Sequence, residues 1–141
     1  MAVDAAPPPT PYAAFGLSAR FHHVGLAVTS VREADPAAKP IVNHTEGVTM
    51  AFVDFHGVTV ELLEPLRDDS PIARSFAAGV KLLHLCFEVD DLDAALAAGC
   101  TAGFHRVSKP IDVPEWGGRR VAWTFSRTFG LVELAERPRT P

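Results

Sequence analysis

An internal repeat constrains this chain more than any other feature of its sequence. The strand-like segment 20–28 returns in altered form at 81–89, and each copy leads through polar residues into a short helical segment. Aligning the two copies pairs His23 with His84. Self-similarity of this kind predicts that one structural unit is built twice. A histidine at the same place in both units predicts a shared role for the two side chains.

The second half of each unit repeats as well. Met50-Ala51-Phe52 aligns with Val121-Ala122-Trp123, and Val60-Glu61-Leu62 aligns with Val132-Glu133-Leu134. Glu61 and Glu133 therefore occupy equivalent positions, as His23 and His84 do. These two histidines and two glutamates are the first candidates for a functional site.

The expected elements follow one order in both units: a strand, a short helix and three more strands. Alternating apolar residues and turn signals predict strands over 20–28, 41–44, 49–55, 58–63, 81–89, 102–108, 120–126 and 131–136. Prolines limit the first helix to two turns within 30–38, and a capping Ser70 before Pro71 predicts a helix over 70–78. A further helix is expected over 92–98, ending at Gly99. The order predicts an α+β fold of two βαβββ modules, residues 20–65 and 81–136.

A chain of 141 residues is long enough for one domain with a substantial core. Residues 1–18 are rich in alanine and proline, which predicts a disordered tail, although Tyr12, Phe15 and Leu17 could hold its last part against the domain. We expect a single domain over 19–137 and a short tail over 138–141.

Composition excludes several classes of function. The net charge of -4 is spread without blocks of like charge, which argues against partners such as nucleic acid or a membrane surface. Cys86 and Cys100 are too few for a disulfide framework. No apolar run reaches transmembrane length, and the N-terminus lacks a signal-peptide pattern. We therefore expect a cytoplasmic protein that acts on a small-molecule substrate.

Two neutral imidazoles and two carboxylates are a suitable ligand set for one divalent transition metal. Four protein ligands on a six-coordinate ion leave two positions for water or a bidentate substrate. Such an ion holds a carbonyl oxygen and stabilises the enolate formed when an adjacent C–H bond loses its proton. A carboxylate beside the ion, Glu133 or Glu61, can take that proton.

The alternation of the strands places all four candidates opposite the bulky aliphatic side chains, on a face that would line a concavity. The same alternation predicts that His22 points away from His23. A solvated sheet face would account for any one of the four residues alone. Their paired recurrence in both units favours a metal site.

Other polar and aromatic residues carry weaker signals. His44 and His56 lie near turns and are expected at the surface, whereas His105 could line a pocket. Trp123 and Phe125 alternate on one strand face and are expected to form a pocket wall or core. The pair Arg119 and Arg120 could meet an anionic substrate group or remain a solvated basic pair.

Four segments of the chain resemble the vicinal oxygen chelate superfamily, and within it they are most similar to the methylmalonyl-CoA epimerase family. The resemblance covers about residues 20–137. The most specific match is the Glu-Leu-Leu-Glu-Pro run at 61–65 followed by Asp-Ser-Pro-Ile-Ala at 69–73; the others are 23–28, 83–91 and 130–134. The turn at 117–120 is also similar.

The resemblance implies paired modules that form a curved mixed sheet around a metal-binding concavity. It implies one divalent metal ion (Co, Ni, Zn, Mn or Fe) with His23, Glu61, His84 and Glu133 as ligands. It also implies that the protein could form a homodimer, because this fold commonly does.

The chain departs from the family pattern at two places. The segment 29–45 is much shorter than the family's first helix and its connection, so one wall of the pocket must differ. Epimerization also needs a proton acceptor and a proton donor on opposite faces of the carbanion. The resemblance implies Glu133 for one role, but Met50 lies at about the position that some members give to the second glutamate. Methionine cannot transfer protons.

The leading hypothesis is a metal-dependent isomerase or epimerase that forms a metal-stabilised enolate on an acyl thioester or a similar β-dicarbonyl substrate. A glyoxalase-type lyase, or an isomerase or cyclase of specialised metabolism, is an alternative because the short first helix would open the pocket. An extradiol dioxygenase is disfavoured because such sites use two histidines and one carboxylate. A metal-free drug-sequestering protein is disfavoured by the intact set of four ligands.

Overall fold

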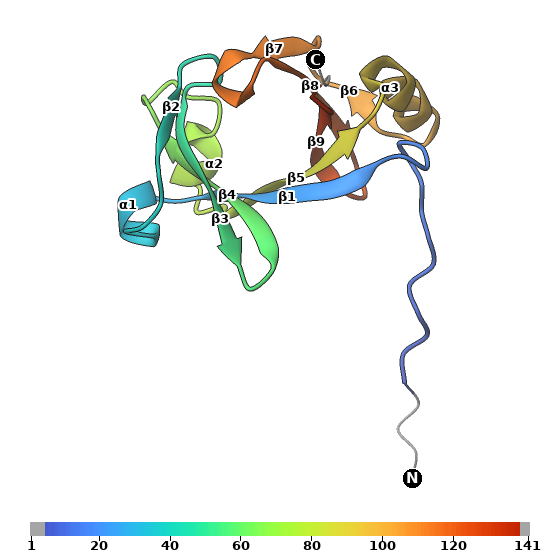
Figure 1. Ribbon diagram of the computed structural model, residues 1–141, viewed down its shortest axis with the longest axis horizontal. Coiled ribbons are helices and arrows are strands. Elements are labelled where there is room, and N and C mark those ends of the chain that lie inside the picture. Colours follow the sequence, from blue (N-terminus) through green and yellow to red (C-terminus); the bar gives the residue numbers. More distant parts are fainter. Residues whose placement is uncertain (1–4, 139–141) are drawn as a thin grey trace.

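The computed structural model of the protein describes residues 5–138. A nine-stranded sheet has the order β2-β3-β4-β1-β5-β9-β8-β6, with β7 also paired to β8. The sheet curves around a central space, with α1 and α3 on its outer side (Figure 1). The elements are β1 (Arg20–Ala27), α1 (Val31–Ala34), β2 (Ile41–Asn43), β3 (Val48–Phe55), β4 (Val58–Pro65), α2 (Ala73–Ala77), β5 (Leu82–Val89), α3 (Leu92–Thr101), β6 (His105–Arg106), β7 (Ile111–Val113), the 3-10 helix η1 (Pro114–Trp116), β8 (Arg119–Ser126) and β9 (Gly130–Glu136).

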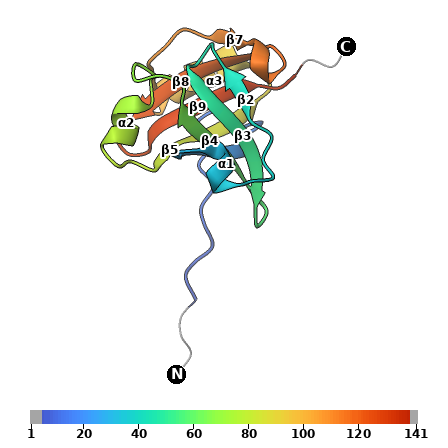
Figure 2. The ribbon, with the colours of Figure 1, turned by 90° about the vertical axis from the view of Figure 1, so that its left-hand side faces the viewer.

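The two modules meet at their first strands. β1 and β5 pair antiparallel at the centre of the sheet, and each pairs in parallel with the last strand of its own module, β4 or β9. Figure 2 shows the first module from its outer side, with β2, β3 and β4 crossing in front of β8 and β9. This arrangement confirms the α+β prediction and places the strands of the four candidate residues side by side.

Equivalent hydrogen bonds confirm the repeat. Ser30 accepts a hydrogen bond from the amide of Glu33 at the start of α1, and Asp91 does the same for Ala94 at the start of α3. These are ordinary N-caps. A carboxylate from the last strand of each module accepts from the first helical amide, Glu64 from Val31 and Glu136 from Leu92, at 3.0 and 2.9 Å.

Two helix ends differ from the prediction. α3 continues past Gly99 to Thr101. Gly99 does not end the helix; it leaves room for the ring of Phe15, because a Cβ at Gly99 would lie 2.7 Å from that ring. The predicted cap at Ser70 is wrong: α2 begins at Ala73, and Ile72 at its N-cap makes no side-chain hydrogen bond. The hydroxyl of Ser70 instead donates to the carbonyl oxygen of Gly47 at 2.6 Å.

The segment 102–118 is also less regular than predicted. The expected strand over 102–108 is reduced to the two residues of β6, and β7 forms between the expected strands 102–108 and 120–126. Both strands pair with the same edge of β8, at His105 with Phe125 and at Ile111 with Val121. Their extent therefore depends on a partner distant in sequence, which local patterns do not reveal.

The segment before β1 packs on the domain. Phe15 is buried in a core cluster with Leu92, Leu96 and Phe104, and the ring of Tyr12 stacks on Phe129. Leu17, by contrast, is 88% exposed. The expected tail over 1–18 thus contains a segment that contributes to the core, while residues 1–4 and 139–141 of the two expected tails lie outside the described range. Within residues 5–138, no helix is long and apolar enough to cross a membrane.

Candidate metal centre

Four adjacent strands bring the candidate residues together. His23 comes from β1, Glu61 from β4, His84 from β5 and Glu133 from β9, and all four side chains are buried. One ligand atom from each lies within 4.8 Å of the ligand atoms of the others. The cluster arises from the sheet order β4-β1-β5-β9, in which the two first strands carry the histidines and their parallel partners carry the glutamates.

The distances fit the corners of one coordination sphere. Nε2 of His23 lies 2.6 Å from Oε2 of Glu61, 3.2 Å from Nε2 of His84 and 3.4 Å from Oε1 of Glu133. Nε2 of His84 lies 3.5 Å from Oε2 of Glu61 and 3.9 Å from Oε1 of Glu133. With metal–ligand bonds of about 2.1 Å, adjacent octahedral ligands are about 3 Å apart and opposite ones about 4 Å.

A buried oxygen of Glu133 also fits a role as a cation ligand. Oε1 of Glu133 is inaccessible to solvent and makes no hydrogen bond within the described residues. An unpaired buried carboxylate oxygen is costly, and a divalent cation would satisfy it. The donor types, their spacing and this oxygen together fit a metal ion, which these four residues could hold.

Gly25 makes room for one of the candidate ligands. It is the cross-strand neighbour of His84 on β1, and a Cβ at Gly25 would lie 2.1 Å from Cε1 of the His84 ring. No side chain other than hydrogen fits there. The glycine that follows His23 by two residues therefore sets the position of the histidine from the second module.

The charges within the cluster attract a cation. Burial alone lowers the pKa of His23, but the adjacent carboxylates of Glu133 and Glu61 outweigh burial and raise it to about 9. Burial raises the pKa of Glu61, but hydrogen bonds with His23 and His84 outweigh this and lower it to about 2. In the absence of metal, His23 therefore carries a proton that a metal ion would have to displace.

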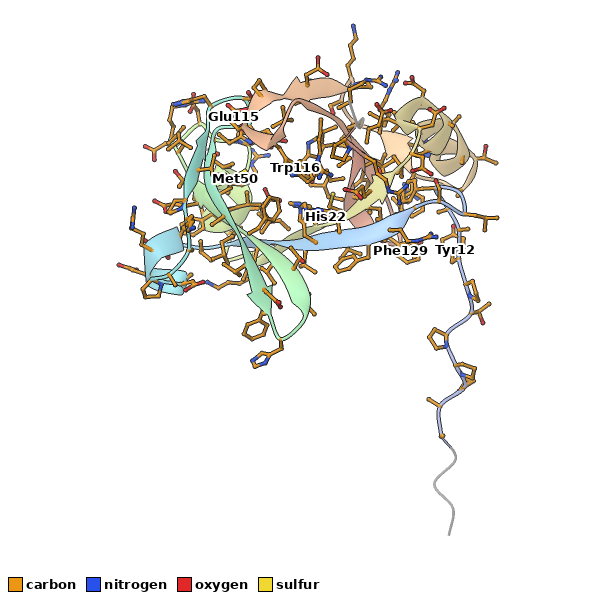
Figure 3. The ribbon with its side chains drawn as sticks, in the orientation of Figure 1. Tyr12, His22, Met50, Glu115, Trp116 and Phe129 are labelled. Carbon is orange, nitrogen blue, oxygen red and sulfur yellow. The ribbon has the colours of Figure 1, made fainter. Side chains whose placement is uncertain are left out.

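The prediction that His22 points away from His23 is wrong. The register between β1 and β5 shifts between Phe21 and His23, and this bulge turns both histidines toward the concavity. Nδ1 of His22 lies 2.8 Å from Nδ1 of His23. Figure 3 shows His22 pointing toward Trp116, with ring centroids 5.2 Å apart.

This contact orients His23. Burial, followed by the charge of His23, lowers the pKa of His22, so its neutral ring can accept a hydrogen bond. If Nδ1 of His23 donates to His22, Nε2 of His23 keeps its lone pair for a metal. Histidine ligands usually have such a partner at the other ring nitrogen. His22 is thus outside the ligand group, but for a reason that strand alternation does not supply.

A cavity of about 420 Å³ opens beside the four residues. Its walls are mainly apolar, and its polar side carries Glu46, Glu61, His84 and Glu133. Trp123 lines the cavity as predicted, with its ring 4.7 Å from that of His84, whereas Phe125 is 47% exposed and His105 is also exposed. His44 and His56 lie at the surface, as expected.

The two arginines after the Gly117-Gly118 turn have partners within the protein. Arg119 forms an ion pair with Glu88, and its guanidinium lies 4.5 Å from the centre of the Trp116 ring. Arg120 pairs with Asp93 at 3.2 Å. Both arginines are thus paired within the protein, and neither lines the cavity.

The place of Glu46 could not be predicted from the sequence. It lies in the turn between β2 and β3, where a polar side chain usually faces water, and no local pattern distinguishes it. Its side chain nevertheless lines the cavity, and its Oε1 is buried without a hydrogen-bond partner among residues 5–138. Met50, by contrast, is 2% exposed and packs with Val48 and Leu63.

Residues 22–123 match the family described as the Glyoxalase/Bleomycin resistance protein/Dioxygenase superfamily. The chain belongs to this superfamily. It is 35% identical over 134 residues to the mitochondrial methylmalonyl-CoA epimerase of Homo sapiens, an alignment that covers 83% of this chain and 73% of that protein. It is 33% identical over 132 residues to the ethylmalonyl-CoA/methylmalonyl-CoA epimerase of Cereibacter sphaeroides, covering 83% and 97%.

Solved structures share the fold of this superfamily member. The methylmalonyl-CoA epimerase of Mycobacterium tuberculosis superposes with a TM-score of 0.68 at 21% identity, covering 84% of this chain and 88% of that one. A variant of the Streptomyces coelicolor methylmalonyl-CoA epimerase in complex with 2-nitronate-propionyl-CoA gives 0.67 at 24% identity, covering 86% and 98%. The sequence similarity to the two epimerases shows that the chain is an enzyme of the isomerase and epimerase type.

Proposed function

We propose that the protein is a divalent-metal-dependent epimerase of a 2-substituted malonyl-CoA thioester such as methylmalonyl-CoA. The observation that carries the proposal is the buried cluster of His23, Glu61, His84 and Glu133 beside a cavity with apolar walls. The names of the curated relatives supply the substrate class.

The α-proton of such a substrate lies between two carbonyl groups and is therefore acidic. When bound, the metal supplies a Lewis acid that holds carbonyl oxygen and stabilises the negative charge left on it. Glu133, or Glu61 in its place, takes the α-proton as the C–H bond breaks and its electron pair moves into the carbonyl system. The apolar walls, including Leu63, Leu83 and Leu131, exclude water from the carbanion.

Chelation tests this proposal directly. Metal-loaded protein should interconvert the two epimers of methylmalonyl-CoA, chelated protein should lose that activity, and one equivalent of divalent metal should restore it. Full activity in the chelated protein would contradict the mechanism. Titration with Co, Ni, Zn, Mn and Fe, followed by elemental analysis, would identify the metal.

One structural feature keeps the lyase alternative open. α1 is a single turn, Val31–Ala34, so the first module contributes little helical cover. Assaying the glutathione hemithioacetal of methylglyoxal beside methylmalonyl-CoA separates the two reactions. Protein that neither retains nor takes up metal would instead favour the drug-sequestering alternative.

A homodimer and a cytoplasmic location remain part of the proposal. Light scattering of the purified protein measures the first, and fractionation of the native cells measures the second.

A further inference from the structure

Epimerization needs two proton-transfer groups, one on each face of the α-carbon. This requirement follows from the proposed epimerase function. Glu133 on β9 serves one face, but the place of the second group in the first module holds Met50, whose thioether cannot carry a proton at neutral pH. Met50 does not line the cavity either; its Sδ lies 3.6 Å from the side-chain Nδ2 of Asn43. If the reaction occurs, another residue must reach the second face.

Glu46 is the remaining carboxyl in the cavity wall. The lining residues include only three carboxylates, Glu46, Glu61 and Glu133, and the last two belong to the ligand cluster. Glu46 enters from the β2–β3 turn, at the opposite end of the sheet order from β8 and β9. Its Oε1 has no hydrogen-bond partner among the described residues, although it is buried. A hydrogen-bonding group of a substrate in the cavity would satisfy this oxygen.

Asn43 holds the rest of the Glu46 side chain in place. The Asn43 side chain is fully buried; its Nδ2 donates to Oε2 of Glu46 at 2.9 Å, and its Oδ1 accepts from the Glu46 amide at 3.0 Å. One oxygen of the carboxyl is therefore fixed and the other is left unbonded. This is the arrangement expected of a positioned acid or base.

The turn that carries Glu46 is itself anchored. The carbonyl oxygen of Gly47 accepts from the hydroxyl of Ser70 at 2.6 Å and from the amide of Leu66 at 3.1 Å. Gly47 has a φ of 71°, which favours glycine, and Thr45 on the other side donates to Glu115 at 3.0 Å. Contacts on both sides hold the backbone at Glu46, so its carboxyl does not depend on a mobile loop for its position.

The surroundings suit a group that both gives and takes a proton. Burial raises the pKa of Glu46, and the charges of Glu133 and Glu61 raise it further; Trp123 and Asn43 lower it, for a result of about 7. The Trp123 side chain lies close enough to the carboxyl to affect its pKa, but Oε1 has no hydrogen-bond partner among the described residues. A bound cation would offset the charges of Glu133 and Glu61, but burial, the largest cause, would still raise the pKa of Glu46 and favour a carboxyl that can give as well as take a proton.

We propose that Glu46 is the second catalytic residue, exchanging a proton with the face of the α-carbon opposite Glu133. In one direction Glu133 takes the α-proton, the C–H electron pair enters the carbonyl system, and protonated Glu46 gives its proton to the carbon. The configuration inverts, and Glu46 is left ionised with Glu133 protonated. Exchange with water restores the starting forms; the reverse reaction uses Glu46 as the base.

The test separates proton removal from inversion. Wild-type protein, Glu46→Gln and the control Glu115→Gln are loaded with metal and given each epimer of methylmalonyl-CoA in D₂O. Exchange of the α-proton is followed by NMR, and inversion by a stereospecific coupling enzyme. Glu115 is exposed, and Glu115→Gln keeps a side-chain oxygen that can accept from Thr45, so this variant removes charge near the turn without removing the anchor.

Glu46→Gln should lose inversion by about 100-fold or more, the usual scale for a general acid or base. It should still exchange the α-proton of one epimer, with retention, within about tenfold of wild type, because Glu133 is intact. Glu115→Gln should match wild type in both measurements. Inversion by Glu46→Gln at a wild-type rate, or loss of exchange for both epimers in folded, metal-loaded variant, would overturn the assignment.

Two further readouts keep this result distinct from failure of the proposed function. A wild-type protein inactive on both epimers overturns both proposals, whereas active wild type with an active variant overturns only the role of Glu46. Binding of 2-nitronate-propionyl-CoA, an anionic ligand of a relative, should weaken in wild type as Glu46 ionises with rising pH, because burial raises the pKa of this carboxyl. The dependence should vanish in Glu46→Gln; equal dependence in both proteins counts against the assignment.

Discussion

Several single residues at this site act indirectly, by making room for a functional side chain or by fixing its position. Gly25 leaves space for the ring of His84, and Asn43 leaves one oxygen of Glu46 unbonded. Neither residue belongs to the ligand group. Substitutions at such positions should therefore change binding or chemistry without removing a ligand.

Gly25→Ala should lower metal affinity by about tenfold or more, because its Cβ would displace the His84 ring. Gly99→Ala is a matched control: it also collides with an aromatic ring, that of Phe15, but away from the site. It should lower the melting temperature and leave metal affinity unchanged. Competitive metal titration of both variants makes the comparison, and equal affinities for Gly25→Ala and wild type would disprove the spatial argument.

Glu46 should make the metal-free fold less stable as pH rises. Its pKa is raised from 4.5 to about 7 in the fold, where it faces Glu133, Glu61, Asn43 and Trp123. Between these values the folded chain binds more protons than the unfolded chain, so the free energy of unfolding falls with pH. The loss is complete above the folded pKa and is on the order of 3 kcal/mol.

Urea unfolding in the presence of chelator measures this effect. The stability of Glu46→Gln relative to wild type should increase from pH 5 to pH 8, whereas Glu115→Gln should show no such gain. A pH-independent difference between Glu46→Gln and wild type would mean that Glu46 titrates normally.

At the scale of elements, irregularities in a strand and a turn position His22 and Glu46 around the four candidate ligands. The bulge in β1 turns His22 toward the concavity, and the anchored β2–β3 turn directs Glu46 into the cavity. Regular strands supply the four candidate ligands, while these two irregular segments supply the groups that orient and complement them.

His22→Phe should weaken metal binding by about tenfold to 100-fold, because the ring packing is kept while the partner of His23 Nδ1 is lost. His22→Gln offers a hydrogen-bond acceptor and should recover part of the affinity. Melting temperatures should stay close to wild type in both variants. Unchanged metal affinity in His22→Phe would show that the contact does not orient His23.

At the scale of the whole molecule, two similar modules place equivalent residues around one candidate metal centre. The segment before β1 completes the core of the second module. Phe15 comes from before β1 and packs between Phe87, Phe104 and Gly99 of the second module. The core therefore begins earlier in the chain than its first strand.

Phe15→Ala should lower the free energy of unfolding by about 3–5 kcal/mol, the usual cost of a large cavity in a core. Leu17→Ala, in the same segment but 88% exposed, should change it by less than about 0.5 kcal/mol. Urea unfolding of the two variants compares them, and similar values would place Phe15 outside the cooperative core.

The sequence by itself determined the repeat and, with it, the pairing of His23 with His84 and of Glu61 with Glu133. These pairings follow from spacing along the chain and from the two-residue period of strands, which are local properties. The shortness of α1 was also predicted from the sequence, because Pro36 and Pro40 limit the helix.

Only the tertiary structure decided the face of His22, the continuation of α3 through Gly99, the partner of Ser70 and the place of Glu46. Each depends on a contact between segments distant in sequence: the shifted register with β5, the ring of Phe15, the carbonyl of Gly47, and the cavity shared with Glu133. Local patterns report which residues share a face, but they do not report what lies opposite that face.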